Sequence, residues 1–307
     1  MKTNPAQPDQ PRTVSPAHQV IFFGNGPLAD AALATLSAAP GIEVIFHART
    51  PADLTTVTNL KRQHPAAFGI LASFGVLIKP DLLQLFEPTG ILNLHPSLLP
   101  AYRGASPIES AILAGDTDFS YSIMKLARRL DAGPIYHQAT LTDLPLDKSA
   151  IYAALASAGA AWLAEHLNHL PTPIPQDDTH ATYTAKLDKS LSQLHPERDP
   201  ADLVLRQIIA YQGYPKPKYQ FFGHTCIIRA AHLAPSPDLA AASNSSTSSL
   251  ASTSTAPADF TPGAPLIAPD HQLLLPCAAG ALIIDQLQPA GKAPMSARAF
   301  LNGYAKV

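Results

Sequence analysis

The 307-residue sequence has little cysteine, little charge and no long apolar run. Its two cysteines, Cys226 and Cys277, are too few for a disulfide framework and lack the CxxC spacing of metal or redox sites, so we expect two small buried side chains. No stretch approaches the roughly 20 apolar residues that a membrane-spanning helix requires. The 21 basic and 23 acidic residues nearly balance, which excludes strong attraction of the whole molecule to nucleic acid. These absences indicate a globular protein with a sizeable core.

The N-terminal segment lacks the apolar stretch of a secretory signal. Residues 1–17 are polar and rich in proline, a composition that buries too little apolar surface to fold. We therefore interpret residues 1–17 as a disordered tail, and we expect a cytoplasmic protein that does not associate with membranes.

Residues 18–170 are predicted to form an α/β domain, because short apolar runs alternate there with helical patterns. The expected strands are 20–23, 42–46, 68–71, 91–94, 121–126 and 135–139. The expected helices are 28–38, 51–62, 80–86, 104–114 and 148–170. Such alternation is typical of a mostly parallel, Rossmann-like sheet that helices cover on both faces.

The composition changes after this domain. Residues 171–198 begin with PTPIPQDD, which cannot be helical, and we interpret them as a linker. Residues 199–307 are predicted to form a C-terminal β-barrel domain of OB-like type, with a helix at 200–211. A Ser/Thr/Ala-rich segment at 236–264 cannot build a packed core, so we interpret it as a low-complexity insertion between strands.

Polar residues suited to catalysis lie where the fourth expected strand ends, the edge at which open α/β sheets bind their ligands. Strand alternation gives Asn93 and His95 the same face. A carboxamide beside an imidazole can polarise a carbonyl and move a proton, and Asp131, in a turn after a later strand, is the candidate to orient the imidazole. On composition alone, hydrogen-bonded loop residues without a catalytic role are the simpler interpretation.

Two motifs change this interpretation. The segment NLHPSLLPAYRGASPI at 93–108, followed by RLDAGPI at 129–135, resembles the active-site pattern of the folate-dependent formyltransferases. The resemblance implies that Asn93, His95 and Asp131 are the catalytic residues. TYTAKL at 182–187 and LQPAGKAPMSARAFLNG at 287–303 resemble the members that formylate initiator methionyl-tRNA.

The resemblance also implies the reactants. The formyl donor is expected to be 10-formyltetrahydrofolate, and the folate site is expected to be lined by Ser97, Leu98, Leu99 and Pro100. No metal is required. The expected partners are folate and initiator methionyl-tRNA, with the protein acting as a monomer in translation initiation. Which of His95 and Asp131 handles each proton stays open.

The chain departs from the family at two places. Members that act on methionyl-tRNA usually carry a long basic loop after the second strand, whereas HART at 47–50 leads here almost directly to the next helix. Before Asp131 the family commonly shows an acidic residue and a glycine, where this chain reads ARRL at 127–130 and so contains Arg128 and Arg129. A formyltransferase for a small amine, such as glycinamide ribonucleotide or an amino sugar, would explain the missing loop but not the C-terminal match. A non-catalytic binding module is the other alternative, against which the intact Asn/His/Asp set argues.

Overall fold

The computed structural model describes residues 18–235, 261–268 and 271–305. The predicted tail at 1–17 and most of the predicted insertion at 236–264 therefore lie outside the described residues. The chain divides into two compact units. The first consists of the residues up to His95, Ser122–Gln138 and Ala153–Gln176, and the second of Pro96–Tyr121, Ala139–Tyr152 and the residues from Asp177 onwards.

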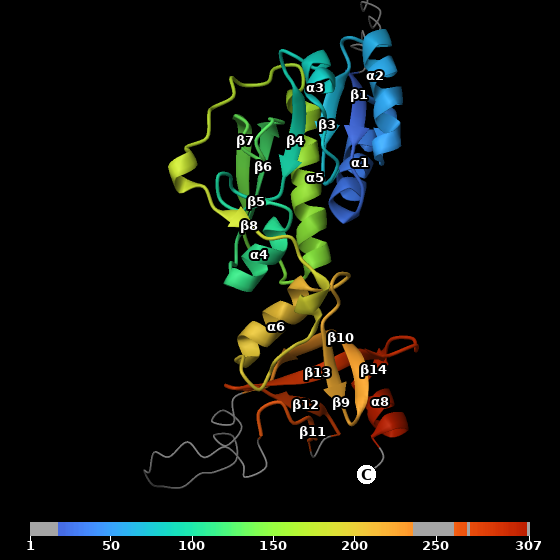
Figure 1. Cartoon of the computed structure of the whole chain (residues 1–307), viewed down its shortest axis with the longest axis vertical. Helices are drawn as coiled ribbons and strands as arrows, with labels where there is room; N and C mark the ends of the chain where they lie inside the picture. Colours follow the sequence, from blue (N-terminus) through green and yellow to red (C-terminus); the bar gives the residue numbers. More distant parts are fainter. Residues whose placement is uncertain (1–17, 236–260, 269–270, 306–307) are drawn as a thin grey trace, which may run out of the picture. The chain divides into compact units, whose positions relative to one another are not determined.

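The first sheet has the strand order β2-β1-β3-β4-β6-β7 (Figure 1). Its strands are β1 (His18–Phe23), β2 (Ile42–Ala48), β3 (Phe68–Leu71), β4 (Ile91–His95), β6 (Phe119–Lys125) and β7 (Ile135–Leu141). Strand β1 pairs in parallel with β2 and β3, and β3 pairs in parallel with β4, whereas β6 is antiparallel to β4. The predicted mostly parallel α/β sheet is confirmed.

Helices cover both faces of this sheet. They are α1 (Pro27–Ala38), α2 (Leu54–Gln63), α3 (Pro80–Leu85) and α5 (Lys148–His166). On one face, Ile21 and Phe23 of β1 pack in a core with Val57 of α2 and Leu82 of α3. The connection from β1 to β2 and the connection from β2 to β3 lead towards opposite edges of the sheet. Because crossovers between parallel strands are right-handed, α1 lies on the face opposite to α2. There α1 lies beside α5, since residues of both helices line one shallow hollow.

The predicted helix at 104–114 begins later than expected. Residues Arg103–Gly104 form a short strand, β5, that pairs in parallel with β8 (Tyr183–Thr184), and helix α4 starts only at Pro107 (Pro107–Ala114). Gly104 has a φ of 119°, a conformation that is costly for any other residue and is incompatible with a helix. Pro107 then starts α4, because proline lacks only a hydrogen-bond donor that the first turn does not use.

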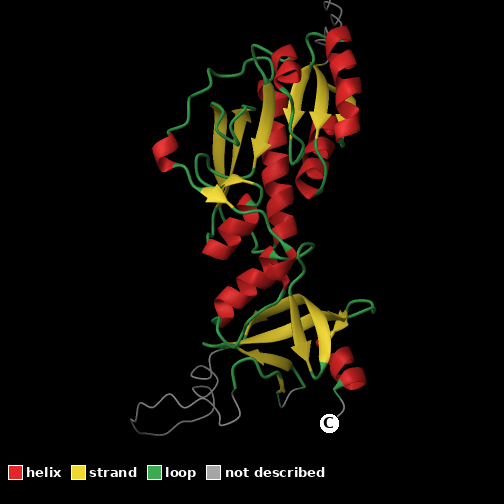
Figure 2. Cartoon of the chain, in the orientation of Figure 1, coloured by secondary structure: helices red, strands yellow, loops and turns green. Residues whose placement is uncertain are grey.

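The segment between α5 and α6 (Ala201–Ala210) is mostly loop (Figure 2). Besides β8 it contains the short helices η2 (Asp178–His180) and η3 (Lys189–Ser192). Its first residues pair with the first sheet, because Ile174 and Ile135 exchange two backbone hydrogen bonds of 2.8 Å. The backbone amide and carbonyl of Ile174, a residue between two prolines, thus hold this proline-rich segment against β7.

The C-terminal sheet is antiparallel and forms a half-barrel with the order β11-β12-β13-β10-β9, and β14 pairs with β13. Its strands are β9 (Lys218–Phe221), β10 (His224–Leu233), β11 (Leu266–Ile267), β12 (Leu273–Pro276), β13 (Ala281–Pro289) and β14 (Met295–Ser296). Helix α8 (Ala297–Tyr304) follows β14. The predicted C-terminal β domain is confirmed, and its strands form an antiparallel half-barrel.

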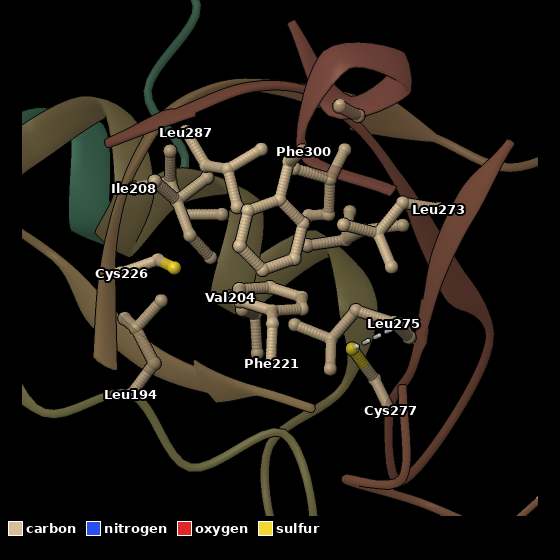
Figure 3. Packing of buried hydrophobic residues seen from close by; sticks show 14 of the residues in the cluster. Leu194, Val204, Ile208, Phe221, Cys226, Leu273, Leu275, Cys277, Leu287 and Phe300 are labelled. Carbon is tan, nitrogen blue, oxygen red and sulfur yellow. Dashed lines mark hydrogen bonds between the residues drawn. The ribbon is translucent and has the colours of Figure 1, made fainter. Parts of the chain in front are cut away.

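One apolar core holds this domain together (Figure 3). Phe221 of β9 and Phe300 of α8 lie at its centre, with ring centroids 6.4 Å apart in an edge-to-face arrangement. Both cysteines belong to this core, Cys226 fully buried and Cys277 only 1% exposed. The expectation of two small buried side chains is confirmed.

Candidate active site

Strand β4 places Asn93 and His95 inside the first sheet. Asn93 lies opposite Leu71 of β3 and Met124 of β6, and His95 lies opposite Ser122 of β6. The two polar side chains share one face of the strand, while Leu92 and Leu94 occupy the other. Asn93 and His95 are each only 5% exposed. Both side chains are therefore largely withdrawn from water at the end of the strand.

The structure brings Asp131 to His95. Asp131 follows β6 in a turn and is 9% exposed. Its Oδ2 lies 3.7 Å from Nδ1 of His95, which is ion-pair distance but longer than a hydrogen bond. A carboxylate at this position can restrict the orientation of the imidazole ring. The three residues predicted to be catalytic therefore converge from β4 and from the β6–β7 turn.

The conformation of that turn depends on a left-handed backbone at Asp131 and on the absence of a side chain at Gly133. Asp131 has a φ of 47°, in the left-handed region that few residues other than glycine adopt. At Gly133, a Cβ atom would lie 1.8 Å from the carbonyl oxygen of Lys125, so no side chain fits there. The amide of Lys125 in turn donates to the carbonyl of Pro134 at 2.9 Å. The DAGP sequence thus folds back closely on the end of β6.

The residues predicted to line the folate site follow His95 directly in the chain. The Ser97 hydroxyl donates to the carbonyl of Ala101 at 2.6 Å, which closes the loop on itself. Leu99 is buried, whereas Leu98 is 48% exposed. An exposed leucine in a rigid loop offers an apolar surface to a ligand.

Arg103, at the end of the same loop, is a buried residue that the sequence did not predict to contribute to this region. Its side chain is fully buried, and its Nη1 lies 2.8 Å from Oδ1 of Asp178 and 3.3 Å from the hydroxyl of Tyr183. The amide of Arg103 donates to the carbonyl of Thr182, and the amide of Thr182 donates to the carbonyl of Pro100. The motif at 93–108 and the motif at 182–187 are therefore hydrogen-bonded to each other. The sequence signal that could have identified Arg103 is a single arginine within a motif rich in proline and leucine.

The connection after β2 is short, as the sequence predicts. Strand β2 ends at Ala48, and the short helix η1 (Pro51–Asp53) begins after Arg49 and Thr50. The carboxylate of Asp53 accepts hydrogen bonds from the amides of both intervening residues, which lowers the pKa of Asp53. The connection of two residues contains no long basic loop. Arg128 and Arg129, the other departure, are exposed just before Asp131.

Within the described ranges, no group of three or more His, Cys, Asp or Glu side chains is placed to hold a metal ion. Among the same residues, no helix is long and apolar enough to cross a membrane.

Solved structures share this fold. HypX from Aquifex aeolicus in complex with tetrahydrofolic acid superposes with a TM-score of 0.68 at 16% identity, over 95% of this chain and 48% of that one. This chain thus spans about half the length of HypX. The methionyl-tRNA formyltransferase from Clostridium thermocellum superposes with a TM-score of 0.57 at 18% identity, over 71% of this chain and 94% of that one.

Sequence comparisons extend the similarity to both domains. The family profile "Formyl transferase" matches residues 10–167, and "Formyl transferase, C-terminal domain" matches residues 198–305. The methionyl-tRNA formyltransferase of Thiobacillus denitrificans is 30% identical over 94% of this chain and 97% of its own length. Together with the buried residues at the end of β4, these matches show that the chain belongs to the formyl transferase family.

Proposed function

We propose that the protein transfers the formyl group of 10-formyltetrahydrofolate to the α-amine of methionine on initiator methionyl-tRNA. The observation that carries the proposal is the buried set at the end of β4, in which Asp131 lies 3.7 Å from His95 and Asn93 shares the strand face of His95. The tRNA acceptor is supported by relatives named methionyl-tRNA formyltransferase that align along almost the whole chain.

The reaction exchanges one carbon–nitrogen bond for another. The donor supplies a formyl carbon bonded to N10. The neutral amine forms a bond to that carbon, the bond to N10 breaks, and the proton released by the amine has to reach N10. Negative charge develops on the formyl oxygen along the way, and a site that stabilises this charge lowers the barrier.

Asn93 and His95 are suited to stabilise the negative charge on the formyl oxygen. The carboxamide of Asn93 and the protonated imidazole of His95 each provide an N–H donor, and both side chains are withdrawn from water, where such donors stabilise charge more strongly. Asp131 supports the imidazolium and assists the movement of the proton towards N10. The separation of 3.7 Å suits a site that tightens when substrate binds, since catalytic hydrogen bonds are often long without it.

The loop that follows His95 is the proposed binding site of folate. We assign Ser97, Leu98, Leu99 and Pro100 to its binding, because the exposed Leu98 offers an apolar surface to an aromatic ring and the internal bond of Ser97 keeps the loop in place.

The tRNA would be bound without the basic loop of other members. Residues 201–307 contain seven basic and five acidic residues in a protein that is acidic overall. Their excess positive charge suits the backbone of an RNA. The exposed Arg128 and Arg129 add positive charge beside the turn of Asp131.

The test is formylation with 10-formyltetrahydrofolate and either charged initiator tRNA or a small amine. His95→Ala, Asn93→Ala and Asp131→Asn should each lower kcat about a hundredfold, the usual cost of losing one such group. His232→Ala is the matched control, because His232 forms a similar pair with Asp285, at 2.9 Å, on the exposed surface of the C-terminal domain. It should keep full activity. Normal turnover in either His95→Ala or Asn93→Ala would contradict the proposed catalytic set.

A second arm identifies the acceptor. Replacing Lys216, Lys218 and Lys292 together by alanine should raise the KM for tRNA and flatten its salt dependence, because fewer counterions are released on binding. Formylation of a small amine should not change. Preferential use of glycinamide ribonucleotide or an amino sugar by the wild-type protein would replace the tRNA proposal by the small-amine alternative.

A further inference from the structure

We propose that Gln176 is a positioning residue for formyl transfer, which holds the β6–β7 turn so that the carboxylate of Asp131 faces His95. The inference rests on the catalytic roles proposed above. Gln176 lies in the segment interpreted from sequence as part of a linker, 45 residues after Asp131.

Gln176 contacts the backbone of that turn at two points, and its Nε2 also lies 3.9 Å from Sδ of Met124 in β6. Its Nε2 donates to the carbonyl of Asp131 at 2.8 Å and to the carbonyl of Gly133 at 2.7 Å. Because both neighbours are carbonyl oxygens, only the nitrogen end of the amide can face them. The amide nitrogen thus donates to two peptide units, Asp131–Ala132 and Gly133–Pro134, and restricts the positions of both.

The turn needs this support because of its backbone. Asp131 adopts a φ of 47°, in the left-handed region that costs free energy for a residue with a side chain, although aspartate adopts it more readily than most. Relaxation of this residue towards an ordinary φ would rotate the direction in which its side chain leaves the backbone. The carboxylate would then move away from Nδ1 of His95. The two bonds from Gln176 oppose this rotation from the carbonyl side of the same residue.

Gln176 is itself held in place by the chain before it. Prolines at 171, 173 and 175 restrict φ and keep the segment extended. Between them, Ile174 exchanges two backbone hydrogen bonds with Ile135, the first residue of β7. The amide of Gln176 therefore reaches the turn from a fixed point only two residues away. What the sequence presents as a spacer holds part of the site.

The experiment compares two glutamines that make the same kind of contact. In Gln176→Met the side chain keeps its length but loses both donors. Gln212→Met is the matched control, because Nε2 of Gln212 donates to the carbonyls of Ile228 and Arg229, at 3.0 and 3.1 Å, within the C-terminal domain. Both variants lose the hydrogen bonds that one side-chain amide donates to two backbone carbonyls, so both should unfold at a lower urea concentration than the wild type.

Only Gln176→Met should lose catalysis. We expect kcat to fall about tenfold to a hundredfold, as displacement of a reacting group by about 1 Å does, while the KM for 10-formyltetrahydrofolate stays within about twofold. Gln212→Met should keep its kcat. Retention of kcat in Gln176→Met, or an equal loss in both variants, would overturn the positioning role.

A third variant supplies a pH signature. In Gln176→Glu, an ionised carboxylate would face two carbonyl oxygens and repel them, whereas a protonated carboxyl group can donate to one of them. The ratio of its kcat to that of the wild type should therefore rise as the pH is lowered from about 8 to about 5, through the raised pKa of a carboxyl in such surroundings. A ratio independent of pH would contradict the proposal.

A measurement without turnover separates this inference from the proposed function. The amide of Ala132 donates to the carbonyl of Arg129, and that of Lys125 donates to the carbonyl of Pro134. Both amides should exchange with solvent at least about tenfold faster in Gln176→Met than in Gln212→Met. If the wild type formylates none of the acceptors, the proposed function fails, yet hydrogen exchange still decides whether Gln176 holds the turn. Unchanged exchange would refute it.

Discussion

Lys148, the first residue of α5, is expected to be among the side chains on which stability depends most. Its Nζ lies 3.3 Å from Oε1 of Glu109 in α4 and donates to the carbonyls of Ala210 and Gln212, at 2.7 and 2.6 Å. The side chains of Lys148 and Glu109 are only 12% and 9% exposed. Burial lowers the pKa of Lys148, and the carboxylate of Glu109 partly offsets this effect. The ammonium group therefore depends on its three acceptors in place of water.

Lys148→Met removes the charge and all three bonds at once. Breaking a buried ion pair from one side costs about 3–5 kcal/mol, because the remaining charge stays buried without its partner. Glu109 would keep the hydroxyl of Tyr152, at 3.0 Å from its Oε1, but two backbone carbonyls at the end of α6 would also lose a donor. We therefore expect the free energy of unfolding to fall by about 3–5 kcal/mol. Adding Glu109→Gln should recover about 1–3 kcal/mol, since it removes the stranded charge.

Urea unfolding followed by circular dichroism measures these differences. Lys125→Met is the control, because Lys125 pairs with Glu87 at 2.6 Å but the two side chains are 23% and 37% exposed. It should cost at most about 1 kcal/mol, as exposed pairs do. The reasoning would be refuted if Lys148→Met cost no more than Lys125→Met, or if Glu109→Gln made the Lys148→Met variant still less stable.

Three further predictions concern the core, the thiols and the turn. Phe300→Ala should lower the free energy of unfolding by about 3–5 kcal/mol through the cavity it leaves, measured by urea unfolding, with a loss below about 1 kcal/mol contradicting the packing. Burial raises the pKa of Cys226 to about 11 and that of Cys277 to about 12, so neither thiol of the folded protein should react with a disulfide reagent at about pH 8, whereas both should react in denaturant. Since the unfolded thiols ionise first, their contribution to stability is complete below about pH 9 and should be lost as the pH rises towards 11 and 12. Gly133→Ala should lower kcat about a hundredfold, because a Cβ atom 1.8 Å from the carbonyl oxygen of Lys125 must displace the turn of Asp131, and unchanged kinetics would show that the turn tolerates this shift.

Local sequence determines most of the secondary structure of this protein. The expected strand at 68–71 coincides with β3, and the strand expected at 91–94 is extended only by His95 in β4. These segments are mostly apolar and bounded by turn residues, a pattern that depends on nearest neighbours and is readable in one sequence. The same alternation gave Asn93 and His95 their common face before any tertiary contact was considered.

The family motif also identified Asp131, but its distance from His95 is a tertiary property. The two residues are separated by 36 positions, and only the pairing of β6 beside β4 brings the turn to the end of β4. Nothing in the alternation of apolar residues states which strands become neighbours, because a strand of given pattern can pair with several partners. The family motif linked Asp131 to His95, which the alternation of apolar residues could not do.

Gln176, Arg103 and Lys148 show what only the tertiary structure decided. Each is a polar side chain in a segment whose composition indicates a linker, a loop or a helix end, and each is held by partners at least 39 positions away in the sequence. Composition predicts exposure for such residues, since burying them costs free energy unless partners are present. Whether those partners are present depends on the folded chain as a whole. The sequence alone therefore specified the elements and the residues of the candidate site, whereas the contacts that fix their geometry exist only once distant segments have met.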